Sequence, residues 1–554
     1  MNPAHPSFLS FHFRNSRPGS QFLLNGFLFL AALTLLPGTS TSAAENSEKF
    51  FSGAQKYQTR YAEKLEALAA WCDENDLKEQ AEKTRNWIAP PEIEDEIRVS
   101  PLPKEFWENE SSQTTPSTAK KSSKKSKTKA SSGTKTRKSS SSQTGQSAPK
   151  DLANEWESRF RQLRISASND YVNFAKKTVS AGHVSLGFGL LMRALHENPD
   201  NLSARKILGY QRTKTCWQTD FEKMNLRAGS VWHEKFGWIP QKHVRKYENG
   251  QRFFNGQWIS EEQDAQLHAS IEKGWVVETG HFQIITDASI EDGVRVGQQL
   301  EKLYRVWKQL FLNYYATEKQ IRSLFEKDSA KFTPIPRHRV LLFKSMEEYS
   351  SYLSSKNMLV QGSVGVYVHR STGEGVSCFV AGEENDRTIF HEVTHQLFEE
   401  SCKTNPRNGE LQNYWAIEAA STFMESFHDT EDGSHAVGGF EDERVRAARI
   451  YFVNSKVFVP FEEFVKVNRQ TWQNSPKVGA FYAQACGMAH FLVFYEHGKY
   501  RDAFGRILFD VYSGRDTLET VSKLTGSSYE TLNQEYQEFI SKNPEAIAGY
   551  QIME

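Results

Sequence analysis

Cysteine is scarce in this sequence. Five cysteines occur in 554 residues, and no two of them show the CxxC spacing of a zinc or redox motif. A disulfide scaffold is therefore excluded, because such domains are small and dense in cysteine. The odd count leaves at least one thiol without a partner inside the chain, and the sequence does not decide whether Cys378 and Cys402 meet.

Long apolar runs are also scarce. The one candidate lies near the start, where Arg14 and Arg17 precede an apolar stretch over 22–36, followed by small residues up to Ala44. This order is typical of a secretory signal peptide, and we expect residues 1–44 to be removed. The alternative, an uncleaved anchor, would need a longer run. We therefore expect an exported protein, periplasmic or extracellular, with no transmembrane segment after signal cleavage.

Acidic residues are absent from residues 111–150. This stretch carries ten lysines and arginines among serine, threonine and glycine, and it contains no aromatic residue. Such a composition cannot bury enough apolar surface to fold, so we expect residues 109–150 to form a disordered linker. A nucleic-acid partner is not expected, because no aromatic residues or nucleic-acid-binding motif accompany the charge. The linker could contact an anionic polymer of the cell envelope or simply be solvated.

The segments beside the linker are rich in helix-forming residues. Residues 45–108 have apolar side chains at helical spacing, and residues 151–215 are also predicted to be helical. Within the second segment, residues 171–210 resemble one tetratricopeptide repeat and the start of another. A single repeat does not form a binding solenoid, so packing against the next domain is the simpler expectation.

Residues 216–273 form a connector rich in glycine and aromatic residues. The Glu248-Asn249-Gly250 sequence predicts a β-hairpin turn. The aromatic side chains could form a carbohydrate or peptide surface, although a small β core is the commoner outcome.

The stretch RTIFHEVTHQLFEES, residues 387–401, carries the clearest chemical pattern. His391 and His395 are four residues apart, so on a helix both imidazoles lie on one face and can bind one ion. Glu392 follows the first histidine and can reach a metal-bound water without being a ligand. Two histidines and a glutamate at this spacing form the HExxH signature of zinc metallopeptidases. The alternative is an ordinary core helix with two histidines on one face.

A zinc site needs a third protein ligand and an open position for water. Phe398 and Ser401 stand where a metzincin would have glycine and histidine, so that arrangement is excluded. Residues 413–427 predict a second helix, on which Glu418 has apolar neighbours that indicate burial. We predict Glu418 as the third ligand, against the alternative of a solvated carboxylate. Glu425, seven residues later on the same face, is expected to support a histidine ligand.

The run HEVTHQ followed by W-x-x-E resembles the gluzincins, the thermolysin-like zinc peptidases, and particularly the peptidase MA-like family of exported bacterial proteins. Those families usually have E-G-x-A at the third ligand, whereas this chain has Glu-Ala-Ala-Ser at 418–421. The resemblance implies an α+β fold over 274–545, in which a small mixed sheet and the HExxH helix precede a helical C-terminal subdomain. It extends to three other segments, at 274–311, 337–353 and 479–495.

The resemblance implies a peptidase that acts on peptide or protein substrates. Zn²⁺ would be held by the two histidines and Glu418, and Glu392 would act as general base toward the zinc-activated water. Aminopeptidase-type gluzincins stabilise the oxyanion with a tyrosine on a later helix, which gives that role to Tyr482. The alternative for Tyr482 is a core aromatic residue, and His490 is the alternative donor.

Strands are predicted over 275–286 and 338–343, with a hairpin over 362–380. In gluzincins an edge strand before the motif helix binds extended peptide, and residues 364–369 or 377–380 could serve as that strand. Three further histidines are expected at the surface and are assigned no role: His369, His428 and His435.

Two function classes remain. The first is an exported zinc metallopeptidase, which the intact His, Glu, His and Glu pattern favours. The second is a non-catalytic envelope scaffold on a gluzincin fold. In either case we expect residues 270–545 to form a unit that is independent of residues 45–108, because the linker separates them.

Overall fold

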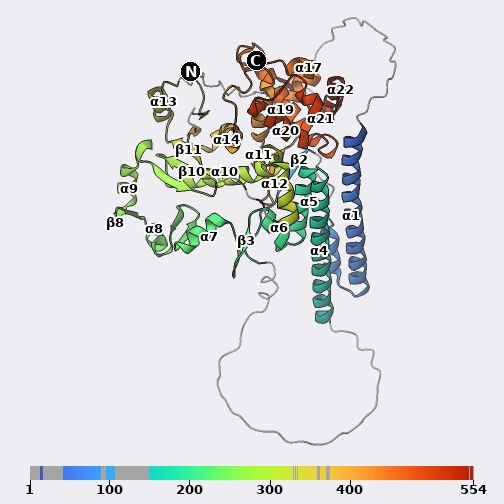
Figure 1. The fold of residues 1–554 in the computed structure, drawn as a ribbon. Coiled ribbons are helices and arrows are strands. Elements are labelled where there is room, and N and C mark those ends of the chain that lie inside the picture. The colour runs from blue at the N-terminus through green and yellow to red at the C-terminus, as the bar shows by residue number, and fades with distance from the viewer. Residues whose placement is uncertain are drawn as a thin grey trace, which may run out of the picture.

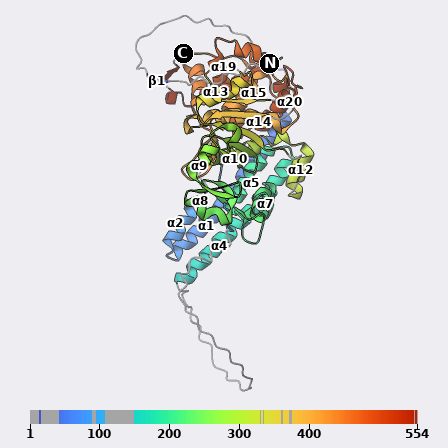
Figure 2. The same cartoon turned by 90° about the vertical axis from the view of Figure 1, so that its left-hand side faces the viewer.

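The computed structural model describes residues 13–15, 41–88, 95–106, 149–328, 335–358, 362–369, 375–547 and 550–552, together with Ala330 and Phe332. These residues combine many helices with several small sheets, which is an α+β architecture (Figures 1 and 2). Most of the predicted signal peptide and of the basic linker lies outside the described residues.

A five-stranded sheet carries the region of the HExxH motif. Its strand order is β12-β13-β11-β10-β9, with parallel pairing among the three central strands and an antiparallel strand at each edge. The strand predicted over 338–343 and the hairpin are confirmed, whereas residues 275–286 form two antiparallel strands. The strands are β9 (Trp275–Glu278), β10 (Phe282–Thr286), β11 (His338–Phe343), β12 (Gly365–Val368) and β13 (Val376–Val380).

The place of β13 in the sheet decides between the two candidate substrate strands. It pairs with β12 on one side and with β11 on the other, so both of its edges are occupied. The interpretation of residues 377–380 as a peptide-binding edge is therefore wrong. Of the two candidates, only β12 lies at an edge.

Helices pack around this sheet and form the largest apolar core. Helix α10 (Ile290–Leu310) begins at Ser289, whose hydroxyl accepts a hydrogen bond from the Asp292 amide, and it buries one apolar face. The motif helix α14 (Asp386–Ser401) and the next helix α15 (Tyr414–Met424) lie in the same core. The other helices are α11 (Leu312–Tyr315), α12 (Glu318–Lys327), α13 (Met346–Ser355), α16 (Glu443–Arg449), α17 (Phe461–Phe464), α18 (Arg469–Gln473), α19 (Val478–Phe494), α20 (Arg501–Ser513), α21 (Thr520–Thr525) and α22 (Tyr529–Ile540).

Helix α19 runs through the middle of the C-terminal helices, against α15, α16, α20 and α22. With its continuation, Val478–His497, it is the one described helix that is long and apolar enough to cross a membrane. By length and composition alone, this helix is a candidate membrane span. The expectation that no candidate follows the N-terminal apolar run is therefore wrong. In this fold 83% of its most apolar window is buried inside the protein, as in the core helix of a folded domain.

The segments on either side of the linker are helical, as predicted. Helices α1 (Thr41–Glu74) and α4 (Pro149–Ser180) lie side by side (Figure 1). Between them and around them pack α2 (Lys78–Asn86), α5 (Val184–Glu197) and α6 (Leu202–Ile207).

Residues 95–106 form an extended segment, called the strap below. It joins the N-terminal helices α1 and α2 to the part of the molecule that contains the motif helix. Strand β2 (Glu96–Val99) pairs with β15 (His435–Gly438), which pairs with β14 (His428–Asp429). Val99 is fully buried in the core that also contains the motif helix. Residues 270–545 are thus not independent of residues 45–108, because the earlier segment supplies a strand to them.

The hairpin β14–β15 changes two expectations for histidines. His428 is exposed, as predicted. His435 is 6% exposed, and its Nδ1 lies 2.8 Å from Asp429 Oδ1, so its assignment to the surface is wrong. The strand pairing with β2 buries this side of the hairpin.

The connector consists of three hairpins, each followed by a short helix. The hairpins are β3–β4 (Gln211–Arg212, Trp217–Gln218), β5–β6 (Ser230–His233, Gly237–Pro240) and β7–β8 (Gln251–Phe254, Gln257–Ser260). The helices are α7 (Asp220–Arg227), α8 (Val244–Glu248) and α9 (Glu261–Leu267). The hairpin turn predicted at Glu248-Asn249-Gly250 is wrong, because these residues end α8 and lead into β7.

Candidate metal centre

Helix α14 is buried along most of its length. All residues from Thr388 to Phe398 are buried. Apolar side chains such as Val393 and Leu397 face the core, and polar side chains such as His391 and His395 contact polar groups on neighbouring elements. The helix begins after Asn385, and Asp386 lies in its first turn, where the Arg295 guanidinium binds its carboxylate at 2.9 Å. This end of the helix is thereby tied to α10.

Three potential ligand atoms converge between α14 and α15. His391 Nε2 and His395 Nε2 are 3.2 Å apart, and Glu418 Oε2 lies 3.6 Å and 3.7 Å from them. All three side chains are buried, with exposed fractions of 3%, 8% and 1%. A tetrahedral ion about 2.0–2.2 Å from each ligand atom holds those atoms about 3.3–3.6 Å apart, so the three positions fit one zinc ion.

The other imidazole nitrogens contact α15 and the residue that follows it. His391 Nδ1 lies 2.7 Å from Glu425 Oε1, and His395 Nδ1 lies 3.1 Å from Ser421 Oγ. Such contacts fix the orientation of each ring, which leaves its Nε2 atom directed at the shared point. The predicted contact between Glu425 and a histidine is present, whereas the Ser421 contact was missed.

Charges behind the cluster stabilise the Glu425 carboxylate. Arg444 Nε donates to Glu425 Oε2 at 2.8 Å, and the Arg387 guanidinium lies 3.7 Å from the same oxygen. Burial alone would raise the pKa of Glu425, but Arg444 and His391 outweigh it and lower that pKa to about 2. Burial likewise opposes protonation of His391, yet hydrogen bonds to Glu418 and Glu425 raise its pKa to about 10. A metal ion would take the place of the proton on His391.

Glu392 lies beside the cluster and touches the edge strand. It is 3% exposed, and its Oε2 accepts a hydrogen bond from the Tyr367 backbone amide on β12 at 2.8 Å. The carboxylate is therefore held between the motif helix and the open edge of the sheet. His369, just after the same strand, is exposed, as predicted, and its Nδ1 lies 3.9 Å from Glu399 Oε2.

The two candidate oxyanion donors lie in different surroundings on α19. Tyr482 is 7% exposed and packs edge-on against Trp472 with ring centroids 5.2 Å apart, and burial raises its pKa well above the usual range. His490 Nε2 instead lies 3.2 Å from the Asp95 carbonyl oxygen, and burial lowers the pKa of His490 to about 4. The contact with Asp95 places His490 against the strap, and the role of Tyr482 stays a prediction.

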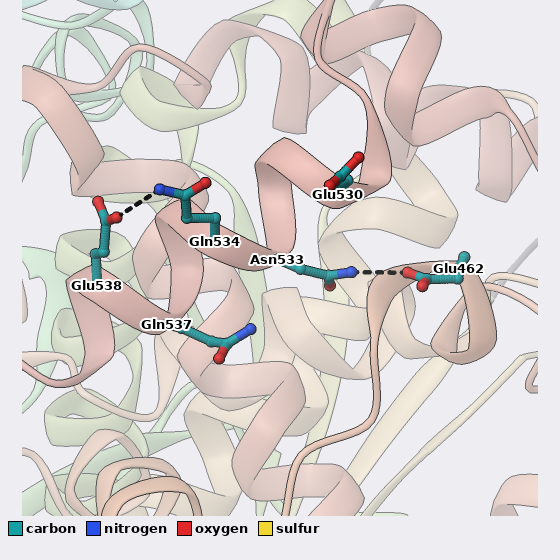
Figure 3. A pocket seen from close by; sticks show the side chains of 6 residues that line it. All are labelled: Glu462, Glu530, Asn533, Gln534, Gln537 and Glu538. Atoms are coloured by element: carbon teal, nitrogen blue, oxygen red, sulfur yellow. Dashed lines mark hydrogen bonds between the residues drawn. The ribbon is translucent and has the colours of Figure 1, made fainter. Parts of the chain in front are cut away.

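A surface pocket elsewhere has no part in this cluster. Figure 3 shows its six polar side chains, which come from α17 and α22: Glu462, Glu530, Asn533, Gln534, Gln537 and Glu538. Hydrogen bonds between neighbours already use some of these groups, as between Asn533 and Glu462 at 2.8 Å. None of the six belongs to the metal-binding group.

The five cysteines are all described, and none of them forms a disulfide. Cys378 is buried in the sheet and Cys402 follows α14, and neither forms a disulfide. The possible pairing of Cys378 with Cys402 is thus not made.

Comparison with known proteins gives no family for this chain. No family model matches the sequence, and no curated protein matches it.

Proposed function

We propose that the protein is an exported zinc-dependent metallopeptidase with a thermolysin-like, gluzincin-type catalytic domain. The observation that carries this proposal is the convergence of two imidazole nitrogens and one carboxylate oxygen next to a fourth buried residue, Glu392. Two nitrogens and one oxygen are a ligand set of catalytic zinc sites, which keep a further position open. The apolar N-terminal run supports export.

The reaction proposed is hydrolysis of a peptide bond. Zinc, when bound, would polarise a water molecule and lower its pKa. Glu392 accepts the proton as the water attacks the carbonyl carbon, and then passes it to the leaving amine. Tyr482 would donate a hydrogen bond to the oxyanion that forms, and burial keeps its phenol protonated for this role.

The substrate would lie along β12. In the β12–β13 ladder, the pairs Val366–Cys378 and Val368–Val376 face each other through hydrogen bonds, as the Val380 amide bonded to the Val364 carbonyl indicates. Gly365 and Tyr367 therefore direct their backbone groups to the open edge. An extended peptide added to that edge lies beside Glu392, which the Tyr367 amide already binds.

Other parts of the chain suggest accessory roles. The basic linker would contact an anionic envelope polymer, because the ten positive charges of residues 111–150 are not balanced by acids. The helices over 151–215 would act as a tetratricopeptide-like support for the catalytic domain.

A non-catalytic envelope scaffold is the second candidate. The deep burial of the His391, His395 and Glu418 side chains favours it, because a structural metal site is closed whereas a catalytic site admits substrate.

Metal analysis and a peptide-library digest of the purified protein test the proposal. We expect one zinc per chain and cleavage that a chelator abolishes and added zinc restores. Stoichiometric zinc without cleavage would favour the scaffold, and absence of zinc would remove the metal centre.

A further inference from the structure

The two oxygens of Glu418 have different partners. Oε2 faces the Nε2 atoms of both histidines at 3.6 Å and 3.7 Å. Oε1 accepts a hydrogen bond from the Tyr414 hydroxyl at 2.5 Å. Tyr414 and Glu418 are four residues apart on α15, so the donor and the carboxylate lie one above the other on one helix face.

The Tyr414 ring is itself held firmly. Its exposed fraction is 0%, and it packs edge-on against Trp472 with ring centroids 5.6 Å apart. The Arg469 guanidinium lies over the ring at 5.2 Å, and the Tyr414 amide donates to the Val467 carbonyl. The hydroxyl is therefore placed by the fold, before any ligand is bound.

We propose that Tyr414 is a positioning residue that makes Glu418 a one-oxygen ligand. A carboxylate can bind a metal through one oxygen or both, and a hydrogen bond from a fixed donor occupies one of them. Binding through Oε2 alone leaves a coordination position for water. This inference rests on the metal centre of the proposed function, but not on the identity of the substrate.

Removing the Tyr414 hydroxyl is the direct test. Tyr414→Phe keeps the ring and its packing while it removes the hydrogen bond to Glu418 Oε1. We expect zinc affinity, measured by competition with a chelator, to fall about 10–100-fold, as for other groups that orient ligands. The melting temperature of the metal-free protein, measured alongside, reports whether the fold is retained.

Tyr500 offers a matched control. Its side chain is 1% exposed, and its hydroxyl donates to Glu535 Oε2 at 2.5 Å, away from the cluster. Tyr500→Phe removes the same kind of hydrogen bond and should leave zinc affinity unchanged. An equal loss in both variants would show a general effect of destabilisation and overturn the inference.

Zinc X-ray absorption on the unmodified protein gives a second measurement that does not depend on a variant folding. We expect one carboxylate oxygen at about 2.0–2.2 Å. Two oxygens from Glu418, or zinc affinity in Tyr414→Phe equal to that of the parent, would overturn the proposal. Lost turnover with unchanged zinc affinity would do the same, because it would make Tyr414 a catalytic donor. A parent protein that binds no zinc would instead refute the metal centre itself.

Discussion

Two buried carboxylates in this molecule have similar burial and different partners. Glu197, at the end of α5, is 6% exposed and accepts hydrogen bonds from the Tyr61 hydroxyl at 2.7 Å and from Trp87 Nε1 at 3.0 Å. The Arg164 guanidinium lies 3.6 Å from the same oxygen. A hydroxyl, an indole N–H and a guanidinium all donate to the carboxylate and offer no lone pair to a metal ion. The protein alone therefore balances the charge of Glu197.

Glu418 also accepts a hydrogen bond from a tyrosine, but its other oxygen faces two imidazoles. A neutral imidazole whose Nδ1 carries the proton presents a lone pair at Nε2. The Glu425 carboxylate can only accept, so its contact places a proton on His391 Nδ1, whereas the Ser421 hydroxyl can serve either tautomer of His395. Burial of a carboxylate therefore does not identify a metal ligand. The atoms that face it do.

The largest effect on metal content is expected from removing Glu418. Glu418→Ala deletes one of three ligands and should abolish stoichiometric zinc. The matched change Glu197→Ala should leave zinc in place and lower the free energy of unfolding by about 3–5 kcal/mol, because Arg164 loses its buried partner. Elemental analysis and chemical denaturation of both variants separate the two roles. Full zinc occupancy in Glu418→Ala would contradict the assignment.

Glu392→Gln separates chemistry from metal binding. Glutamine has the same shape and can still accept the Tyr367 amide, but it cannot take a proton at neutral pH. We expect turnover to fall about 10²–10⁴-fold while zinc content and melting temperature remain those of the parent. Unchanged turnover would remove the enzyme interpretation, and lost zinc would make Glu392 a ligand.

A smaller effect is expected at Glu425. Glu425→Gln removes the charge behind His391 and should weaken zinc binding about 10–100-fold. Glu400 is a matched control, because its carboxylate lies 2.5 Å from the Nδ1 atom of His338, outside the cluster. Chelator competition should show a loss for Glu425→Gln and none for Glu400→Gln. Equal affinities in the two variants would mean that Glu425 has no role in positioning His391.

The ligand set could be predicted because its pattern is local. The positions of His391, His395 and Glu418 follow from helical periodicity, and both helices formed where apolar spacing indicated them. Tyr414 could also have been found, since it stands one turn before Glu418. Arg444 could not, because it reaches Glu425 from a separate helix whose packing depends on the whole core.

Two features of the fold were not predicted, for different reasons. The connector repeats a glycine, a hairpin with a tryptophan and a helix, at spacings that place Trp217, Trp238 and Trp258 in equivalent positions. Comparing the sequence with itself would have detected this. The pairing of β2 with β15 carries no such signal, because the strands lie more than 300 residues apart and nothing in either one specifies its partner.

The smallest effect is expected from cutting the chain inside residues 109–150, because the pairing of β2 with β15 joins the parts on either side of the cut. Trypsin should cut there, because lysine and arginine are frequent. The two products should stay together because β2 pairs with β15 and Val99 is fully buried. In addition, the Trp217 amide donates a hydrogen bond to the Lys104 carbonyl oxygen. We expect co-elution on native gel filtration with unchanged zinc content. Val99→Asp, which places a charge in the core, should weaken this association without abolishing it, because α1 still packs against α4. Separation in the parent with zinc retained would restore the independent unit that the sequence suggested.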